Sequence, residues 1–228
     1  MCNFGEVNVN GEEVRTPLLV VWYERFLSDH DAQAFAHAAS LRYTSGSLER
    51  LLMFGDRYAR RAAVLALGMV GDYSSNSVVG NALVDRDRGV RTLAENSIRN
   101  LWLRVGTPQQ RSALRKIVDL NRHKDHHGAV DLATKLIHDC PWIAEAWCQR
   151  GTAYFHRGQY ELAIRDCNQA LEINPYHFTA AAGIGQCFLL MNNMTAALDA
   201  FRRALRLNPS MEEVRAQVVK LQKSAQED

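Results

Sequence analysis

The chain has little of what interrupts regular structure. Its 228 residues include 14 glycines and 5 prolines, and no stretch is rich in glycine and serine. This composition leaves little room for flexible linkers or disorder. Long apolar runs are absent too, because the run 17–23 is closed by Glu24 and Arg25. Such a run is too short for a secretory signal or a membrane span, so we expect a cytoplasmic protein without membrane contact.

Catalytic and metal-binding motifs are also missing. The sequence has no glycine-rich phosphate loop, no GxSxG, no HExxH and no CxxC. Cys2 is not followed by residues like those of amidotransferases that use an N-terminal cysteine. The other cysteines, at 140, 148, 167 and 187, form no close-spaced pair and are expected to be reduced thiols, mostly in the core. We expect no enzyme, no catalytic residue and no cofactor.

What the chain does have is an internal period. Pro141, Pro175 and Pro209 stand 34 residues apart, and other positions recur at the same interval. The pairs are Gly151 with Gly185, Tyr154 with Phe188, Ala163 with Ala197, Cys167 with Phe201, Ala170 with Ala204 and Leu171 with Leu205. Together with Trp147, Gly158 and Tyr160, this unit resembles the tetratricopeptide repeat. The resemblance implies pairs of antiparallel helices that stack into a solenoid and bind other proteins.

The residue types suit such a stack. Small residues at 151, 163 and 170 let two helices approach closely, and Trp147 and Tyr154 fill the space beside them. Each proline ends the second helix. A weaker unit precedes Pro141, in which Ala129 and Leu136 keep the second-helix pattern. After Pro209, residues 211–226 place Val214, Val218 and Leu221 on one stripe, which predicts a terminal capping helix.

The first half has a shorter period of 31 residues. Asp56 and Arg60 align with Asp87 and Arg91, and Leu52, Ala63 and Leu67 align with Leu83, Ala94 and Ile98. These runs resemble short HEAT repeats of the bilin-lyase type. Extending the period backward predicts a degenerate first unit over about 20–53.

Both repeat types are helix pairs, so we predict an all-α fold, a continuous α-α solenoid of HEAT-like pairs followed by tetratricopeptide pairs. Residues 1–19 are expected to form a polar leader, with a turn at Asn10-Gly11 as an alternative. The HEAT-like region spans 20–106, and the tetratricopeptide region with its capping helix spans 107–228. Thr107 and Pro108 at the boundary are typical of a helix start, as N-cap and first helical residue.

Two polar clusters in the first two thirds of the chain have competing interpretations. The arginines Arg57, Arg60, Arg61, Arg88 and Arg91 form a basic surface that suits nucleic acid. We prefer a structural role, in which Asp56 and Asp87 pair with Arg60 and Arg91 and with neighbouring turns as an inter-repeat ladder. The second cluster, residues 123–127, contains three histidines. The 34-residue period places it in a turn, where it would be solvated, so we predict no metal site.

The period also predicts the concave groove of the tetratricopeptide region. Its residues are Glu145, Gln149, Thr152, Phe155, His156, Thr179, Gln186, Leu189 and Leu190. Members of this family that bind chaperones hold a peptide carboxylate with lysine, asparagine and arginine, whereas this chain has Leu114, Val118, Gln149, Thr179 and Gly183 at those positions.

We therefore predict a non-enzymatic scaffold whose groove binds a neutral or amphipathic segment of a protein partner. Packing of Leu189 and Leu190 within the solenoid, or in a homodimer, is the alternative for the apolar end of the groove. A role of the HEAT-like half in nucleic-acid binding, or as a chromophore-lyase-like module, is the alternative function.

Overall fold

The structure is a computed structural model that describes residues 16–227, with side chains to residue 223. Its regular structure over these residues consists of α-helices and one short 3₁₀ helix, without a strand, which confirms the all-α fold. The first half contains α1 (Leu18–Asp29), α2 (Ala32–Arg42), α3 (Ser45–Phe54), α4 (Arg57–Val70), η1 (Tyr73–Ser75), α5 (Asn76–Ala82) and α6 (Arg88–Trp102). The second half contains α7 (Pro108–Arg122), α8 (His126–Asp139), α9 (Ala144–His156), α10 (Tyr160–Ile173), α11 (Phe178–Leu190), α12 (Met194–Leu207) and α13 (Glu212–Glu227).

The expected leader is only partly accessible to this comparison. Helix α1 begins at Leu18, inside the segment 1–19. The turn expected at Asn10-Gly11 lies outside the described residues. Among the helices that are described, none combines the length and the apolar character that crossing a membrane requires.

The 34-residue period governs the geometry of the second half. Helices α8, α10 and α12 begin at 126, 160 and 194, and α9, α11 and α13 begin at 144, 178 and 212. The turns inside three successive pairs contain a left-handed residue at the same position, with φ of 64° at Lys124, 72° at Gly158 and 58° at Asn192. Glycine and asparagine adopt this conformation readily, whereas lysine does so at a cost. The unit before Pro141 is therefore a helix pair of the same kind.

Both ends of the second half are built as the sequence predicts. Thr107 accepts a hydrogen bond from the backbone of Gln110, whose side chain accepts one from Thr107 in return, and Pro108 is the first residue of α7. At the other end Val214, Val218 and Leu221 of α13 are buried in the core that α9 to α12 form. Helix α13 thus covers the end of the array as a cap.

The 31-residue period is visible in the first half. Helices α4 and α6 begin at 57 and 88, and each follows an aspartate whose side chain accepts backbone N–H groups of the first turn. The predicted first unit of 20–53 is wrong in its boundary. The first pair is α1 and α2, which ends at Arg42, because Thr44 caps α3 and begins the second pair there.

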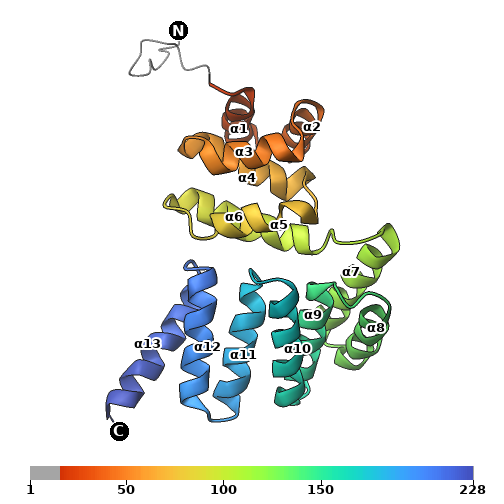
Figure 1. The fold of residues 1–228 in the computed structure, drawn as a ribbon, viewed down its shortest axis with the longest axis vertical. Coiled ribbons are helices and arrows are strands. Elements are labelled where there is room, and N and C mark those ends of the chain that lie inside the picture. Colours follow the sequence, from red (N-terminus) through yellow and green to blue (C-terminus); the bar gives the residue numbers. More distant parts are fainter. Residues whose placement is uncertain (1–15, 228) are drawn as a thin grey trace.

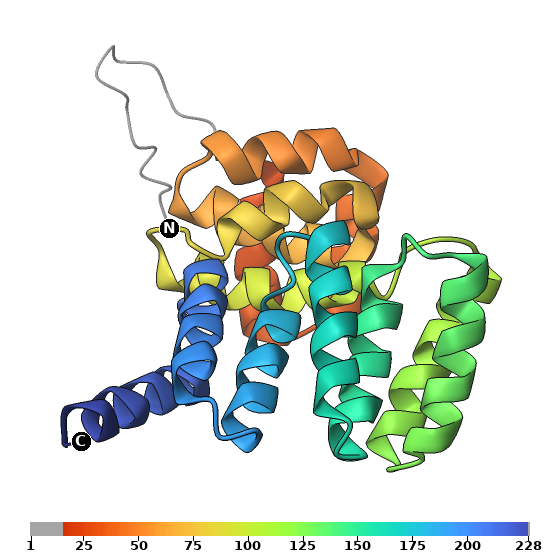
Figure 2. The same ribbon diagram turned by 60° about the horizontal axis from the view of Figure 1, so that its bottom comes forward.

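The two halves do not extend end to end, which the repeats did not predict. Figure 1 shows α3 to α6 lying across the ends of α9 to α12, and Figure 2 shows the same crossing from below. The turn before α11 enters the core of the first half, where Phe178 is fully buried. Trp102 of α6 stacks on His177 with ring centroids 4.1 Å apart. The chain therefore folds back on itself after α6.

A short chain of buried hydrogen bonds fixes this junction. The indole Nε1 of Trp102 donates to Asn76 Oδ1 over 2.8 Å, and Asn76 Nδ2 donates to Asn174 Oδ1 over 3.0 Å. Asn174 ends α10, one residue before Pro175. The polar groups that cross from one half to the other are thus paired, as buried polar groups must be.

Candidate functional site

Helices α9, α10 and α11 enclose a concavity of about 220 Å³. Its lining consists of Cys148, Gly151, Thr152, Phe155, His156, Ala163, Cys167, Thr179, Gly183, Gln186 and Cys187. Five of the nine predicted groove residues, Thr152, Phe155, His156, Thr179 and Gln186, meet here. The 34-residue register thus predicted the location of the concavity.

The concavity exists because the two repeats differ at one core position. In the second repeat the ring of Phe201 lies against Gly185, so closely that a Cβ on that glycine would come within 2.5 Å of it. The equivalent residue in the first repeat is Cys167, whose Sγ would lie 3.0 Å from a Cβ on Gly151 and 3.5 Å from one on Gly183. A thiol in place of a phenyl ring leaves volume unfilled, and that volume opens to the groove.

Three thiols line the concavity and stay protonated near neutral pH. A hydrogen bond with Cys167, together with burial, raises the pKa of Cys148 well above its usual value. Burial raises the pKa of Cys187 to about 11. Since only the thiolate is a good nucleophile or metal ligand, these sulfurs act as soft apolar surface.

Among the residues that the structure describes, the Gln186 amide makes no hydrogen bond within the protein. The hydroxyls of Thr152 and Thr179 are already engaged, the first with Cys148 O and the second with His177 Nδ1. The lining contains no carboxylate, lysine or arginine. The concavity therefore offers an apolar floor with one free amide at its wall.

Two predicted groove residues are occupied inside the protein. Glu145 is 9% exposed, and its carboxylate accepts hydrogen bonds from His177 Nε2 at 3.0 Å and from Gln149 Nε2 at 2.7 Å. The other end of the Gln149 amide accepts one from Asn121 at 3.0 Å. Their prediction as partner-binding residues needs correction, because both side chains tie α9 to its neighbours.

The apolar end of the groove divides between its two leucines. Leu189 is half-buried and packs against the core of α9 to α13. Leu190 is 54% exposed and does not line the concavity. The alternative of packing within the solenoid thus holds for Leu189, and Leu190 remains free for a partner or a second copy.

The histidine cluster lies beside the mouth of the concavity. His126 stacks on His156 with centroids 4.7 Å apart, and His156 contacts Phe155 edge-on. Burial and the neighbouring His156 lower the pKa of His126. His123 hydrogen-bonds the carbonyl of Asp119 through Nδ1. Within the described part of the chain, no three histidine, cysteine, aspartate or glutamate side chains gather in a metal-binding arrangement.

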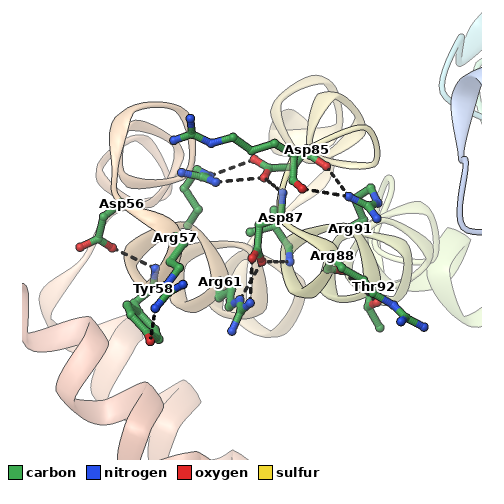
Figure 3. Close-up of polar contacts among 12 residues, drawn as sticks. Asp56, Arg57, Tyr58, Arg61, Asp85, Asp87, Arg88, Arg91 and Thr92 are labelled. Atoms are coloured by element: carbon green, nitrogen blue, oxygen red, sulfur yellow. Dashed lines mark hydrogen bonds and ion pairs between the residues drawn. The ribbon is translucent and has the colours of Figure 1, made fainter.

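An inter-repeat ladder joins the turns of the first half, but its partners differ from the predicted ones (Figure 3). Arg60 makes two hydrogen bonds to Asp85, at 2.9 and 3.0 Å, and Arg61 makes two to Asp87, both at 2.7 Å. Asp56 instead caps α4. Aspartates at N-caps can take up a neighbouring guanidinium only where the next repeat brings one close, which sequence spacing does not specify.

The remaining arginines of the predicted basic surface differ in their engagement. Arg91 donates to the backbone carbonyl of Asp85 over 2.8 Å. Arg57 lies over the ring of Tyr58 and hydrogen-bonds its hydroxyl. Arg57 and Arg88 are exposed and have no carboxylate partner among the described residues. Most of this cationic charge thus holds the repeats together.

Sequence reasoning did not assign Gly151, Ala163, Cys167 and Cys187 to the groove. The signal for Cys167 was present in its alignment with Phe201, which predicts a smaller side chain at a core position. The other three depend on how far the neighbouring helix stands away, which the cysteine itself determines.

Comparison with known proteins identifies the repeats of the second half. Family models described as tetratricopeptide repeat match residues 144–177 and 179–211. A human protein SGT1 homolog is 29% identical over 104 residues, which is 46% of this chain and 28% of that protein. A TPR repeat-containing protein of Rhizobium etli is 27% identical over 134 residues, 59% of this chain and 66% of its own length. The chain thus spans less than two thirds of these relatives.

Solved structures show the same fold. The first TPR of Spaghetti (RPAP3), bound to an HSP90 peptide, superposes with a TM-score of 0.50 and 21% identity over 53% of this chain and 96% of that one. The Sgt2 TPR domain from Aspergillus fumigatus gives a TM-score of 0.50 with 20% identity, over 53% and 82%.

Proposed function

We propose, on the premise that residues 144–177 and 179–211 are tetratricopeptide repeats, that this chain is a non-catalytic adaptor. Its concavity between α9 and α11 accepts an uncharged apolar side chain of a partner segment. The Gln186 amide pairs with the backbone of that segment. This arrangement is a groove-docking mode in which apolar anchors give affinity and few polar groups fix orientation.

The chemistry of the lining carries this proposal. A volume of about 220 Å³ with three protonated thiols, two glycines and the Phe155 ring favours an aliphatic or aromatic side chain. A carboxylate placed there would be desolvated without a cation to pair with it, at a cost of several kcal/mol. A neutral anchor avoids that cost.

The proposed partner differs from the one in the related structure. That structure of RPAP3 holds an HSP90 peptide whose sequence ends in EEVD. At the positions that resemble a carboxylate clamp this chain has Val118, Gln149 and Gly183. Gln149 is moreover engaged with Glu145 and Asn121. We therefore propose that the groove binds an internal or neutral segment and does not bind an acidic C-terminus.

All four cysteines of the described chain are unpaired. Free buried thiols support a reducing compartment, and we propose the cytoplasm as the place of action.

A comparison of partners recovered by wild type and by a Thr152→Arg/Gln186→Arg variant tests the proposal. The two arginines would occupy the concavity, so we expect the wild-type partners to be lost. The matched control is Asn96→Arg/Asn168→Arg, which adds the same charge at two exposed positions outside the concavity. If the groove variant recovers the same partners as wild type, the groove is not the binding site.

A further inference from the structure

A second apolar surface lies on the first half of the molecule, where α3 ends. Phe54 is 80% exposed and Met53 beside it is 51% exposed, although both are large apolar side chains. Two hollows flank this point and share Phe54 and Gly55 in their linings. We call Met53, Phe54 and the two hollows the Phe54 surface.

The two hollows are of a size that side chains of a partner can fill. The first, of about 680 Å³, lies between the end of α3 and α5, with Leu52, Val78 and Ala82 among its walls. The second, of about 610 Å³, lies on the other side, with Tyr43 and Leu51. Phe54 stands between them as a ridge. A segment laid across the ridge can place one apolar side chain on each side.

The charges around the Phe54 surface are of one sign. Arg86 lines the first hollow and Arg50 the second, and neither has a carboxylate partner among the described residues. The carboxylate that lines the first hollow, Asp85, is neutralised because Arg60 binds both of its oxygens. The second hollow has no carboxylate in its lining. Each hollow thus combines an apolar wall with a free cation.

We propose that the Phe54 surface docks an acidic protein segment with apolar anchors on either side of the Phe54 ridge. The acidic residues of the segment pair with Arg50 and Arg86 at the rim, where charge complementarity sets specificity and association rate. The exposed ring of Phe54 supplies the central contact, as aromatic residues do in protein interfaces. This site is independent of the groove between α9 and α11, so the chain has two docking surfaces.

A lipid surface is disfavoured by the polar groups inside the hollows. Asn81 and the Arg60–Asp85 pair line the first hollow, and Ser47 lines the second. Acyl chains that entered would leave the amide and the hydroxyl without hydrogen-bond partners, which is costly. A protein segment can pair with them through its backbone.

Selection of peptides on the intact chain tests the proposal with a defined probe. A phage-displayed library of random 12-residue peptides is panned on the full-length protein after clearing on the Phe54→Ala variant. We expect the enriched sequences to combine aspartate or glutamate with aromatic or branched aliphatic residues. Enrichment of neutral or basic sequences, or of none that discriminates against Phe54→Ala, would overturn the proposal.

The most enriched peptide is then synthesised with a fluorophore and titrated by fluorescence polarisation. We expect roughly a tenfold loss of affinity for Phe54→Ala and a loss of similar size for Arg50→Glu/Arg86→Glu, as for hot-spot residues. Leu41→Ala and Arg206→Glu remove or reverse exposed side chains elsewhere and should bind as wild type. Thr152→Arg should also bind as wild type, which separates this surface from the groove. All these side chains except Thr152 are exposed, so the variants should fold, and circular dichroism checks this.

Two other outcomes would assign the surface to something else. Cosedimentation with phosphatidylserine vesicles that depends on Phe54, without peptide binding, would make it a membrane contact. A dimer by light scattering that becomes a monomer in Phe54→Ala would make it a self-association face. Either result overturns the acidic-segment proposal.

Discussion

Cys167 occupies the core position at which the following repeat has Phe201. The thiol leaves room beside Gly151 and Gly183, and this room is the concavity of the groove. A single side chain therefore separates a repeat that packs solidly from one that offers a pocket. The function that we propose for the groove depends on that residue.

Cys167→Phe should close the concavity and abolish partner binding through the groove. The second repeat shows that a phenyl ring against glycine is tolerated there, so we expect the free energy of unfolding to change by less than about 3 kcal/mol. Cys167→Ala keeps the space open and should bind partners as wild type does. Binding is measured by recovery of partners and stability by urea denaturation. Retained partners in a folded Cys167→Phe protein would contradict this account of the concavity.

The sequence predicted the groove residues as far as the 34-residue register determines them. Thr152, Phe155 and Gln186 lie where the register places them. The register could not predict that Glu145 is buried, because its partner His177 belongs to a turn 32 residues away. Spacing along a helix says which face a residue occupies, and it does not say what the opposite face brings.

Helix pairs of the first half are held in register by the Arg60–Asp85 and Arg61–Asp87 contacts. Asp87 has two tasks, since it also caps α6 through the backbone N–H of Val90. The sequence predicted the caps correctly from the recurring aspartates. It misassigned the ion pairs, because Asp85 lies outside the aligned positions.

Acid should weaken this ladder within a defined pH window. The Arg61 guanidinium is the main reason that the pKa of Asp87 falls from 3.8 to about 2. Because the pKa is lower in the folded state, the stabilisation is present above pH 3.8 and is lost as the pH falls toward 2. Asp87→Asn keeps a capping side chain and loses the charge, so we expect about 1 to 2 kcal/mol of destabilisation at neutral pH. That difference from wild type should shrink across the window in urea titrations.

Asp131→Asn is the matched control, because Asp131 is exposed and has no ion pair among the described contacts. It should leave the free energy of unfolding unchanged at all these pH values. If Asp87→Asn is as stable as wild type near neutral pH, the ladder contributes nothing to the fold.

The whole molecule is two helical arrays that cross at one buried junction. Trp102, His177 and Phe178 form its centre, and Asn76 and Asn174 carry its hydrogen bonds. The periods of 31 and 34 residues could not predict this arrangement, since they describe neighbours along each array. A contact between positions 76 and 174 follows from neither period.

Trp102→Ala should uncouple the two halves. It removes the stack on His177, the contact with Phe178 and the hydrogen bond to Asn76, and we expect about 3 to 5 kcal/mol of destabilisation. Thermal unfolding followed by circular dichroism should then show two transitions where wild type shows one. Trp142→Ala is the control, because Trp142 is 55% exposed and should leave the transition unchanged. A single unshifted transition in Trp102→Ala would mean that the junction does not couple the halves.

Docking in the groove between α9 and α11 is the central claim, and site-specific photocrosslinking tests it most directly. A benzophenone amino acid is introduced at Gln186, which lines the concavity, and in a second protein at Asn168, which is exposed on α10 outside it. The account predicts a crosslinked partner from position 186 that disappears when Thr152→Arg is added, and none from position 168. Crosslinking at 168 but not at 186 would contradict it.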